Sequence, residues 1–273
     1  MKKTCQLLLI TIFTLINSAK ANCTQDTIPP HDTFTIVSKQ IGETRTINVW
    51  IPEEYTFTMT SLPVLYMTDG GVKEDFPHIA NTLARLIRKK EIPAIILVGI
   101  ENTQRRRDLT GETNVKEDLE IAPVVGGADK FRAFIKEELF PKINDKYRTT
   151  NKKGIIGESL SGLFVVETLM LQPEMFDFYI AFDPSLWWNN NYLLKTAKEH
   201  LSKIQSDQHK QFWFAGSGTK GIAPIMEGLE KVLIDKKSPN LKWLYISKPN
   251  EEHHTIFKAT KDDALIWTLG KSD

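Results

Sequence analysis

A serine between an apolar run and a helical pattern is the residue of this sequence best suited to act as a nucleophile. Ser159 stands in Gly157-Glu158-Ser159-Leu160-Ser161-Gly162, directly after the apolar run 153–157. A strand, a sharp turn and a helix in this order form a nucleophile elbow, where small neighbours are needed because the backbone is strained and the helix packs closely. Here Ser161 replaces the usual second glycine. A serine could also merely cap the helix, but the strand–turn–helix context favours a nucleophile.

The general base that a serine nucleophile needs is usually a histidine. In chains with such an elbow, this histidine comes after both the serine and the acid. Four histidines follow Ser159, and only His253 and His254 lie between the last expected strand and the last expected helix. We therefore predict His253 as the base, with His254 as the alternative.

The acid that orients the histidine has two candidate positions. It usually follows the strand expected at 211–215, but the segment 216–221 contains no carboxylate. Asp183 ends the preceding strand, at the same edge of the sheet as Ser159, although Asp before Pro also favours a turn. We predict Asp183 as the acid. Glu227, or a Ser–His pair without an acid, is the alternative.

Two backbone N–H groups are expected to stabilise an oxyanion near Ser159. The first belongs to Leu160, because the turn places it at the N-terminus of a helix. The second should come from the loop after an earlier strand, through Gly70 or Gly71 of Asp69-Gly70-Gly71.

Three larger side chains after strand ends are candidates for substrate binding. Trp187 and Trp188 could form the wall of an apolar or aromatic acyl pocket, and ordinary core packing is the alternative for each. Arg107 could hold an anionic substrate. Its alternative is a local ion pair with the neighbouring Asp108.

Strand-like and helical patterns alternate along the chain and indicate an α/β fold. Strands are expected at 33–38, 45–51, 64–68, 94–100, 153–157, 178–182, 211–215 and 241–246. Helices are expected at 76–90, 127–147, 160–171, 192–203, 222–234 and 256–269, and a long loop at 102–125. This alternation predicts a mostly parallel central sheet flanked by helices on both faces, with ligands bound beyond the carboxyl ends of its strands.

The first 21 residues have the pattern of a secretory signal peptide. Lys2 and Lys3 precede the short apolar run 7–16, and Ala19-Lys20-Ala21 fits a cleavage site. An uncleaved anchor is the alternative, although the run is short for a membrane span. We expect a single domain at 22–273, periplasmic or secreted, with no stable membrane insertion after cleavage.

Composition excludes several kinds of partner. The net charge is +1, from 35 basic and 34 acidic residues, so no nucleic-acid partner is expected. Cys23 would be the lone cysteine after cleavage, which leaves no internal disulfide. No cluster has metal-ligand spacing, so neither a metal nor another cofactor is expected. Nothing in the sequence indicates an oligomeric state.

From about Phe34 to its end the chain resembles the putative-esterase family of α/β-hydrolases, which includes esterase D-like enzymes, siderophore esterases and mycolyltransferases. The resemblance rests on the segments 65–70, 107–110, 127–131, 157–163, 183–188 and 252–255. It implies an α/β-hydrolase fold and a serine hydrolase that cleaves small-molecule carboxylic esters, with siderophore-like esters among the candidates, through an acyl-enzyme on Ser159. An acyltransferase on the same nucleophile and a non-catalytic binding protein of the same fold are the alternatives.

Overall fold

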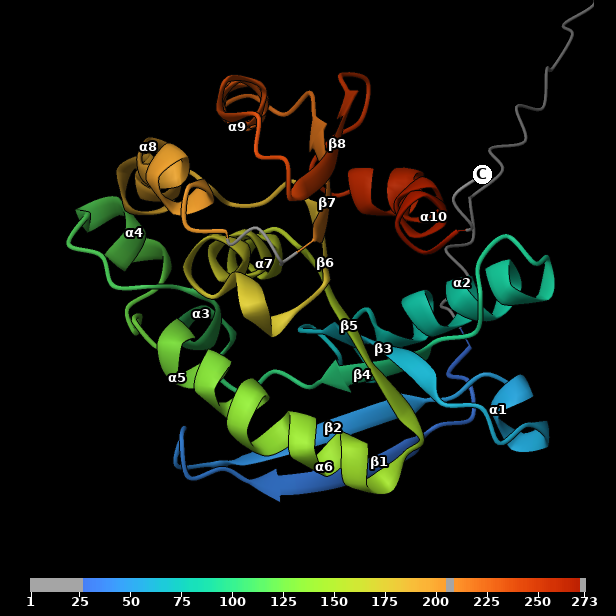
Figure 1. Ribbon diagram of the computed structural model, residues 1–273. Coiled ribbons are helices and arrows are strands. Elements are labelled where there is room, and N and C mark those ends of the chain that lie inside the picture. Colours follow the sequence, from blue (N-terminus) through green and yellow to red (C-terminus); the bar gives the residue numbers. More distant parts are fainter. Residues whose placement is uncertain (1–26, 205–208, 271–273) are drawn as a thin grey trace, which may run out of the picture.

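Eight strands form one sheet in the computed structural model, which describes residues 27–204 and 209–270 (Figure 1). The strands are β1 (Asp32–Val37), β2 (Thr44–Trp50), β3 (Leu62–Met67), β4 (Ile96–Ile100), β5 (Thr149–Glu158), β6 (Phe178–Phe182), β7 (Lys210–Ser217) and β8 (Leu241–Lys248). The signal peptide expected at 1–21 and Cys23 lie outside the described residues.

The sheet order is β1-β2-β4-β3-β5-β6-β7-β8. The pairs β1–β2 and β2–β4 are antiparallel, whereas the pairs from β4 through β3 to β8 are parallel. Parallel neighbours need crossover connections, which helices supply here. The carboxyl ends of β3, β5, β6 and β7 therefore meet along one edge of the sheet, as the sequence predicts.

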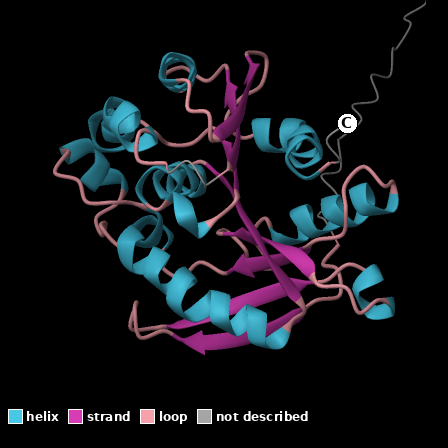
Figure 2. Ribbon diagram, viewed as in Figure 1, coloured by secondary structure: helices cyan, strands magenta, loops and turns pink. Residues whose placement is uncertain are grey.

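Helices cover both faces of the sheet (Figure 2). They are α1 (Glu54–Phe57), α2 (Phe76–Arg88), α3 (Arg105–Leu109), α4 (Lys116–Ile121), α5 (Ala128–Phe134), the π-helical η1 (Ile135–Leu139), α6 (Phe140–Lys146), α7 (Leu160–Leu171), the 3₁₀ turn η2 (Pro173–Met175), α8 (Trp188–Leu201), α9 (Ala223–Lys236) and α10 (Ile256–Leu269). Helices α2 and α10 lie against one face, and α5 to α9 lie against the other (Figure 1).

Two hydrophobic layers result, because successive residues of a strand point to opposite faces. In β3, Val64 and Tyr66 belong to the layer under α5 to α9, whereas Leu65 and Met67 belong to the layer under α2 and α10. Both layers are buried, and this explains why these strands read as nearly continuous apolar runs.

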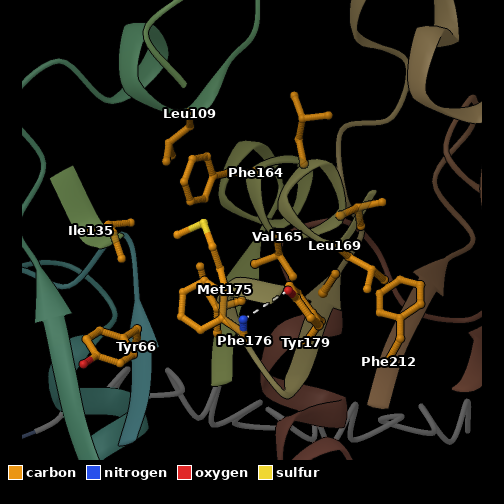
Figure 3. Close-up of a cluster of buried hydrophobic side chains, with 14 of the residues drawn as sticks. Tyr66, Leu109, Ile135, Phe164, Val165, Leu169, Met175, Phe176, Tyr179 and Phe212 are labelled. Carbon is orange, nitrogen blue, oxygen red and sulfur yellow. Dashed lines mark hydrogen bonds between the residues drawn. The ribbon is translucent and has the colours of Figure 1, made fainter. Parts of the chain in front are cut away.

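Aromatic side chains fill the layer beneath α7 (Figure 3). The Phe176 ring meets the Tyr179 ring nearly at a right angle, with 5.8 Å between centroids. The buried Tyr179 hydroxyl accepts a hydrogen bond from the Phe176 N–H at 3.3 Å and donates to the Pro173 carbonyl at 3.1 Å. The polar end of this core tyrosine is therefore satisfied, as burial requires.

Three expected elements differ in detail. The loop expected at 102–125 contains the short helices α3 and α4. The helix expected at 127–147 contains a π-helical segment shortly before Pro141, whose missing N–H prevents a regular helical bond there. Helix α8 is assigned from Trp188, but Asn189 to Asn191 have positive φ angles, so regular helix starts near 192, as expected.

Within residues 27–204 and 209–270, no helix is long and apolar enough to cross a membrane.

Candidate active site

Ser159 occupies a sharp turn between β5 and α7. Its φ of 60° and ψ of −121° are a strained conformation for a residue with a side chain. A Cβ on Gly157 would lie 2.6 Å from the carbonyl carbon of Ser161, and one on Gly162 would lie 3.1 Å from the Phe182 oxygen. The glycines are therefore needed because strand, turn and helix approach so closely. The structure has the elbow geometry that the sequence predicts.

The imidazole of His253 lies between Ser159 and Asp183. Its Nε2 is 3.1 Å from the Ser159 Oγ, and its Nδ1 is 3.1 Å from the Asp183 Oδ2. Both distances are within hydrogen-bonding range. The hydrogen bond that the Asp183 carboxylate accepts from the His253 ring raises the pKa of His253, and burial partly opposes this shift. The structure therefore brings together three residues that are 94 positions apart at most.

The loop that carries His253 is locked to the end of β7. The His253 N–H donates to the Thr219 Oγ at 2.9 Å, and the Gly218 N–H donates to the Glu251 carbonyl at 2.9 Å. The side chain of His254, the alternative base, is 75% exposed, and its Nδ1 lies 3.3 Å from the Glu252 Oε2.

Asp183 is fully buried and has a φ of 39°. Its Oδ1 accepts the Ser217 N–H at 2.6 Å, and its Oδ2 accepts the Ser217 hydroxyl at 2.6 Å. Ser217 ends β7, the strand that the acid usually follows. The end of β7 therefore carries the residue that donates hydrogen bonds to the acid, and not the acid itself. Glu227 lies in α9, and the histidine pairs with Asp183 instead.

The sequence pattern did not predict a role for Ser217 or Ser185. The Ser185 hydroxyl lies 3.4 Å from the Ser159 hydroxyl. Serines are common at turns and helix starts, so the residue type alone carries no distinctive signal. For Ser217 the signal is its position, at the end of the strand that follows Asp183.

The expected oxyanion donors differ in their availability. Leu160 is the first residue of α7, and an N–H in the first turn has no acceptor within its helix. The Gly70 N–H donates to the Ile100 carbonyl at 2.9 Å, so the prediction of Gly70 as a donor is wrong. The Gly71 N–H donates to the Glu74 carboxylate at 2.7 Å, an acceptor on a side chain and not on the backbone.

Arg107 has the local pairing that was its alternative. Its guanidinium pairs with Asp108 at 2.6 Å and with Glu43, so these carboxylates compete with any bound anion and the substrate-binding prediction is not supported. Arg105, two residues earlier, instead makes two hydrogen bonds with Asp69, at 2.5 and 2.8 Å.

The two tryptophans have different environments. Trp188 is 5% exposed, and its indole N–H donates to the Gly111 carbonyl at 3.2 Å, so Trp188 is a core residue. Trp187 is half-buried at the edge of the same hydrophobic layer, with its ring centroid 6.0 Å from that of Trp188. Only Trp187 retains surface with which to contact a ligand.

Two partly buried carboxylates, Glu158 next to Ser159 in the chain and Asp75 at the start of α2, have raised pKa values. Burial raises the pKa of Glu158 to about 7, and the negative charge of Asp75 adds to this shift. Burial, with the charge of Asp69, raises the pKa of Asp75 to about 6. Among the described residues no group of three or more His, Cys, Asp or Glu side chains could hold a metal ion.

The sheet order, the helices on both faces and the serine elbow define an α/β-hydrolase fold. The family model described as "Putative esterase" matches residues 38–232. The chain therefore belongs to the putative-esterase family, as the sequence resemblance predicts.

Two relatives have substrates in their names. Ferri-bacillibactin esterase BesA of Bacillus subtilis is 32% identical over 193 residues, which are 64% of this chain and 65% of BesA. Siderophore triacetylfusarinine C esterase of Aspergillus fumigatus is 36% identical over 162 residues, 54% of this chain and 53% of that protein. The match therefore spans less than two thirds of either relative.

Solved structures share the fold over most of the chain. An IroE-like serine hydrolase from Shewanella oneidensis has a TM-score of 0.80 and 26% identity, with 88% of this chain and 80% of that chain covered. The BES protein from Bacillus cereus has a TM-score of 0.80 and 21% identity, with 90% of this chain and 99% of that chain covered. The second likeness shows the fold alone.

Proposed function

We propose that this protein is a serine carboxylic-ester hydrolase that acts through an acyl-enzyme on Ser159. The observation that carries the proposal is the position of the His253 ring, within 3.1 Å of both the Ser159 hydroxyl and the Asp183 carboxylate. Such an arrangement is the one in which histidine accepts the serine proton while the acid orients the ring. A protein that only bound ligands would not need these two contacts.

The reaction proceeds in two halves. The Ser159 Oγ attacks the ester carbonyl carbon, and its proton moves to the His253 Nε2. The tetrahedral intermediate collapses, the bond to the alcohol oxygen breaks, and His253 returns the proton to the leaving alcohol. Water then attacks the acyl-enzyme in the same way and gives a carboxylic acid and free Ser159. The Asp183 carboxylate stabilises the charged imidazolium in both halves.

Siderophore-like esters are the proposed substrate class. The support comes from the two relatives named as esterases of ferri-bacillibactin and of triacetylfusarinine C. The half-buried ring of Trp187, in the segment between β6 and α8, could contact an aromatic or apolar acyl group.

Export from the cytoplasm is also part of the proposal. The residues 1–21 have the charge, apolar run and cleavage site of a signal peptide, which would leave the esterase domain 22–273 periplasmic or secreted. N-terminal sequencing of the protein from a cell fraction outside the cytoplasm should begin at Asn22, and a sequence beginning at Met1 would contradict this.

Turnover of p-nitrophenyl esters by the purified protein tests the activity. The wild type should hydrolyse p-nitrophenyl butyrate, and Ser159→Ala should reduce turnover to background, because within residues 27–204 and 209–270 no other hydroxyl is hydrogen-bonded to the His253 Nε2. Ser202→Ala is the matched control, since Ser202 is exposed at the end of α8. Turnover that survives Ser159→Ala but depends on the protein would overturn the assignment.

A further inference from the structure

The carboxylate of Glu74 accepts a hydrogen bond from the backbone N–H of Gly71. The N–H donates to the Glu74 Oε2 at 2.7 Å, and the Glu74 N–H donates to the Gly71 carbonyl at 2.9 Å. Gly71 and Glu74 are therefore joined by two hydrogen bonds, one to a side chain and one between backbone groups. They close the turn that leads from β3 into α2.

A chain of side chains holds this carboxylate in place. The Asn102 amide donates to the Glu74 Oε1 at 2.9 Å and to the Asp69 Oδ1 at 2.5 Å. Arg105 then binds both oxygens of Asp69. Glu74 is therefore held from both of its oxygens and is not a freely rotating surface side chain.

The turn that carries Gly71 contacts the elbow that carries Ser159. Strands β3 and β5 are parallel neighbours whose pairing runs as far as Met67 with Ile156. The Thr68 hydroxyl is hydrogen-bonded to the Ser161 hydroxyl in the first turn of α7. The turn after β3 and the elbow are thus joined, and Gly71 is the donor in this turn whose N–H could turn to a substrate oxygen.

We propose that Glu74 is a positioning residue that occupies the second oxyanion donor until a substrate carbonyl displaces it. The inference rests on the proposed function, because an oxyanion forms only if Ser159 attacks an ester. A carboxylate competes for the N–H through a charge-assisted hydrogen bond, and its charge opposes the negative charge that develops on the substrate oxygen.

This arrangement favours esters that carry binding groups away from the reacting carbonyl. The binding free energy of such groups offsets the cost of displacing Glu74 from Gly71, whereas a small ester lacks groups that bind in this way. Large, multiply substituted esters are therefore the substrate class that we infer for this site. Small activated esters should be hydrolysed more slowly than their chemical reactivity alone would lead one to expect.

The test compares Glu74→Gln with the wild type and with Glu101→Gln. Glutamine keeps the size of the side chain and removes its charge. Glu101 is a matched control, because its Cγ lies next to Gly71, 2.9 Å from where a Cβ would be, while the N–H itself donates to Glu74. The measured quantities are the rate constant of fluorophosphonate labelling, kcat/KM for p-nitrophenyl acetate, and the Ki of phenylboronic acid, which forms a tetrahedral adduct with an active serine.

Glu74→Gln should speed labelling and raise kcat/KM for the acetate about fivefold, and tighten boronic acid binding by a similar factor, because a neutral acceptor competes more weakly. Glu101→Gln should leave all three unchanged. A merely structural role for Glu74 would lower the melting temperature without improving boronic acid binding.

Two results would overturn the inference alone: unchanged or slower reaction in Glu74→Gln while the wild type is labelled, or an equal gain in Glu101→Gln, which would indicate general electrostatics. Absence of labelling in the wild type would overturn the proposed function and this inference together.

Discussion

The two sides of the candidate site use their hydrogen-bonding groups differently. On the side of β6 and β7, Asp183 and Ser217 already hold His253 against Ser159. On the side of β3, the Gly71 N–H is bound to Glu74. The acid–base side is therefore assembled without a ligand, whereas the oxyanion side has to exchange one acceptor for another. Substitutions on the first side should lower activity, and Glu74→Gln on the second should raise it.

His253→Ala should have the largest effect. It removes the group that accepts the serine proton, so kcat/KM should fall by about five orders of magnitude, measured with a p-nitrophenyl ester. His254→Ala is the matched control and should stay near the wild-type value, because its side chain is exposed. Equal losses in both variants would mean that the loop, and not the ring of His253, is what matters.

Asp183→Asn should lower kcat/KM by about 10⁴-fold, because an amide cannot stabilise the imidazolium. It should also move the pH profile. The imidazole must be neutral to accept a proton, so activity is lost as pH falls through the raised pKa of His253. Since Asp183 is the largest cause of that raised pKa, its loss should shift the acid limb of kcat/KM to lower pH. If the acid limb did not move, a group other than His253 would be responsible for it.

Ser217→Ala should cost less, about tenfold in kcat/KM, because one of the two Ser217 donors to Asp183 is lost while the backbone N–H remains. Ser202→Ala serves again as the exposed control. If Ser217→Ala matched the loss in Asp183→Asn, the acid–base side would depend on this one hydroxyl and would be less robust than its geometry indicates.

Glu158→Gln should have the smallest effect, on stability. Burial raises the pKa of Glu158 to about 7, with further raising from Asp75, Asp183 and Asp69 and a lowering effect of His253. The folded protein thus binds this proton more tightly than the unfolded chain, and that contribution is lost as pH rises from the unfolded pKa through about 7.

Glutamine is neutral at every pH, so Glu158→Gln should exceed the wild type in free energy of unfolding by about 1 kcal/mol at pH 8 and by little at pH 4. Thermal unfolding at the two pH values measures this. A variant less stable than the wild type at pH 8 would show that the carboxylate of Glu158 is favourably bound.

Much of this site could be predicted from sequence because strand ends are easy to locate. The expected bounds 178–182, 160–171 and 256–269 agree with β6, α7 and α10, since their apolar patterns are long and end sharply. These bounds place Asp183, Ser159 and His253 at one edge. Helices α3 and α4 were missed because five or six residues are too few for a helical period to emerge.

The errors concern partners, which sequence patterns do not reveal. Gly70 and Gly71 are the same residue type in adjacent positions, and only the fold shows that the Gly70 N–H donates to the Ile100 carbonyl. Similarly, nothing near Arg107 in the sequence shows that Glu43, more than sixty positions away, pairs with it. Such contacts depend on tertiary packing and carry no local signal.

Mass spectrometry of the fluorophosphonate-labelled protein tests the central claim most directly. The account predicts a single adduct, with fragment ions that place the added mass on Ser159 and not on Ser161 or Ser185 of the same peptide, and no adduct in His253→Ala over the same reaction time. An adduct on another serine, or labelling that is indifferent to His253, would contradict the account.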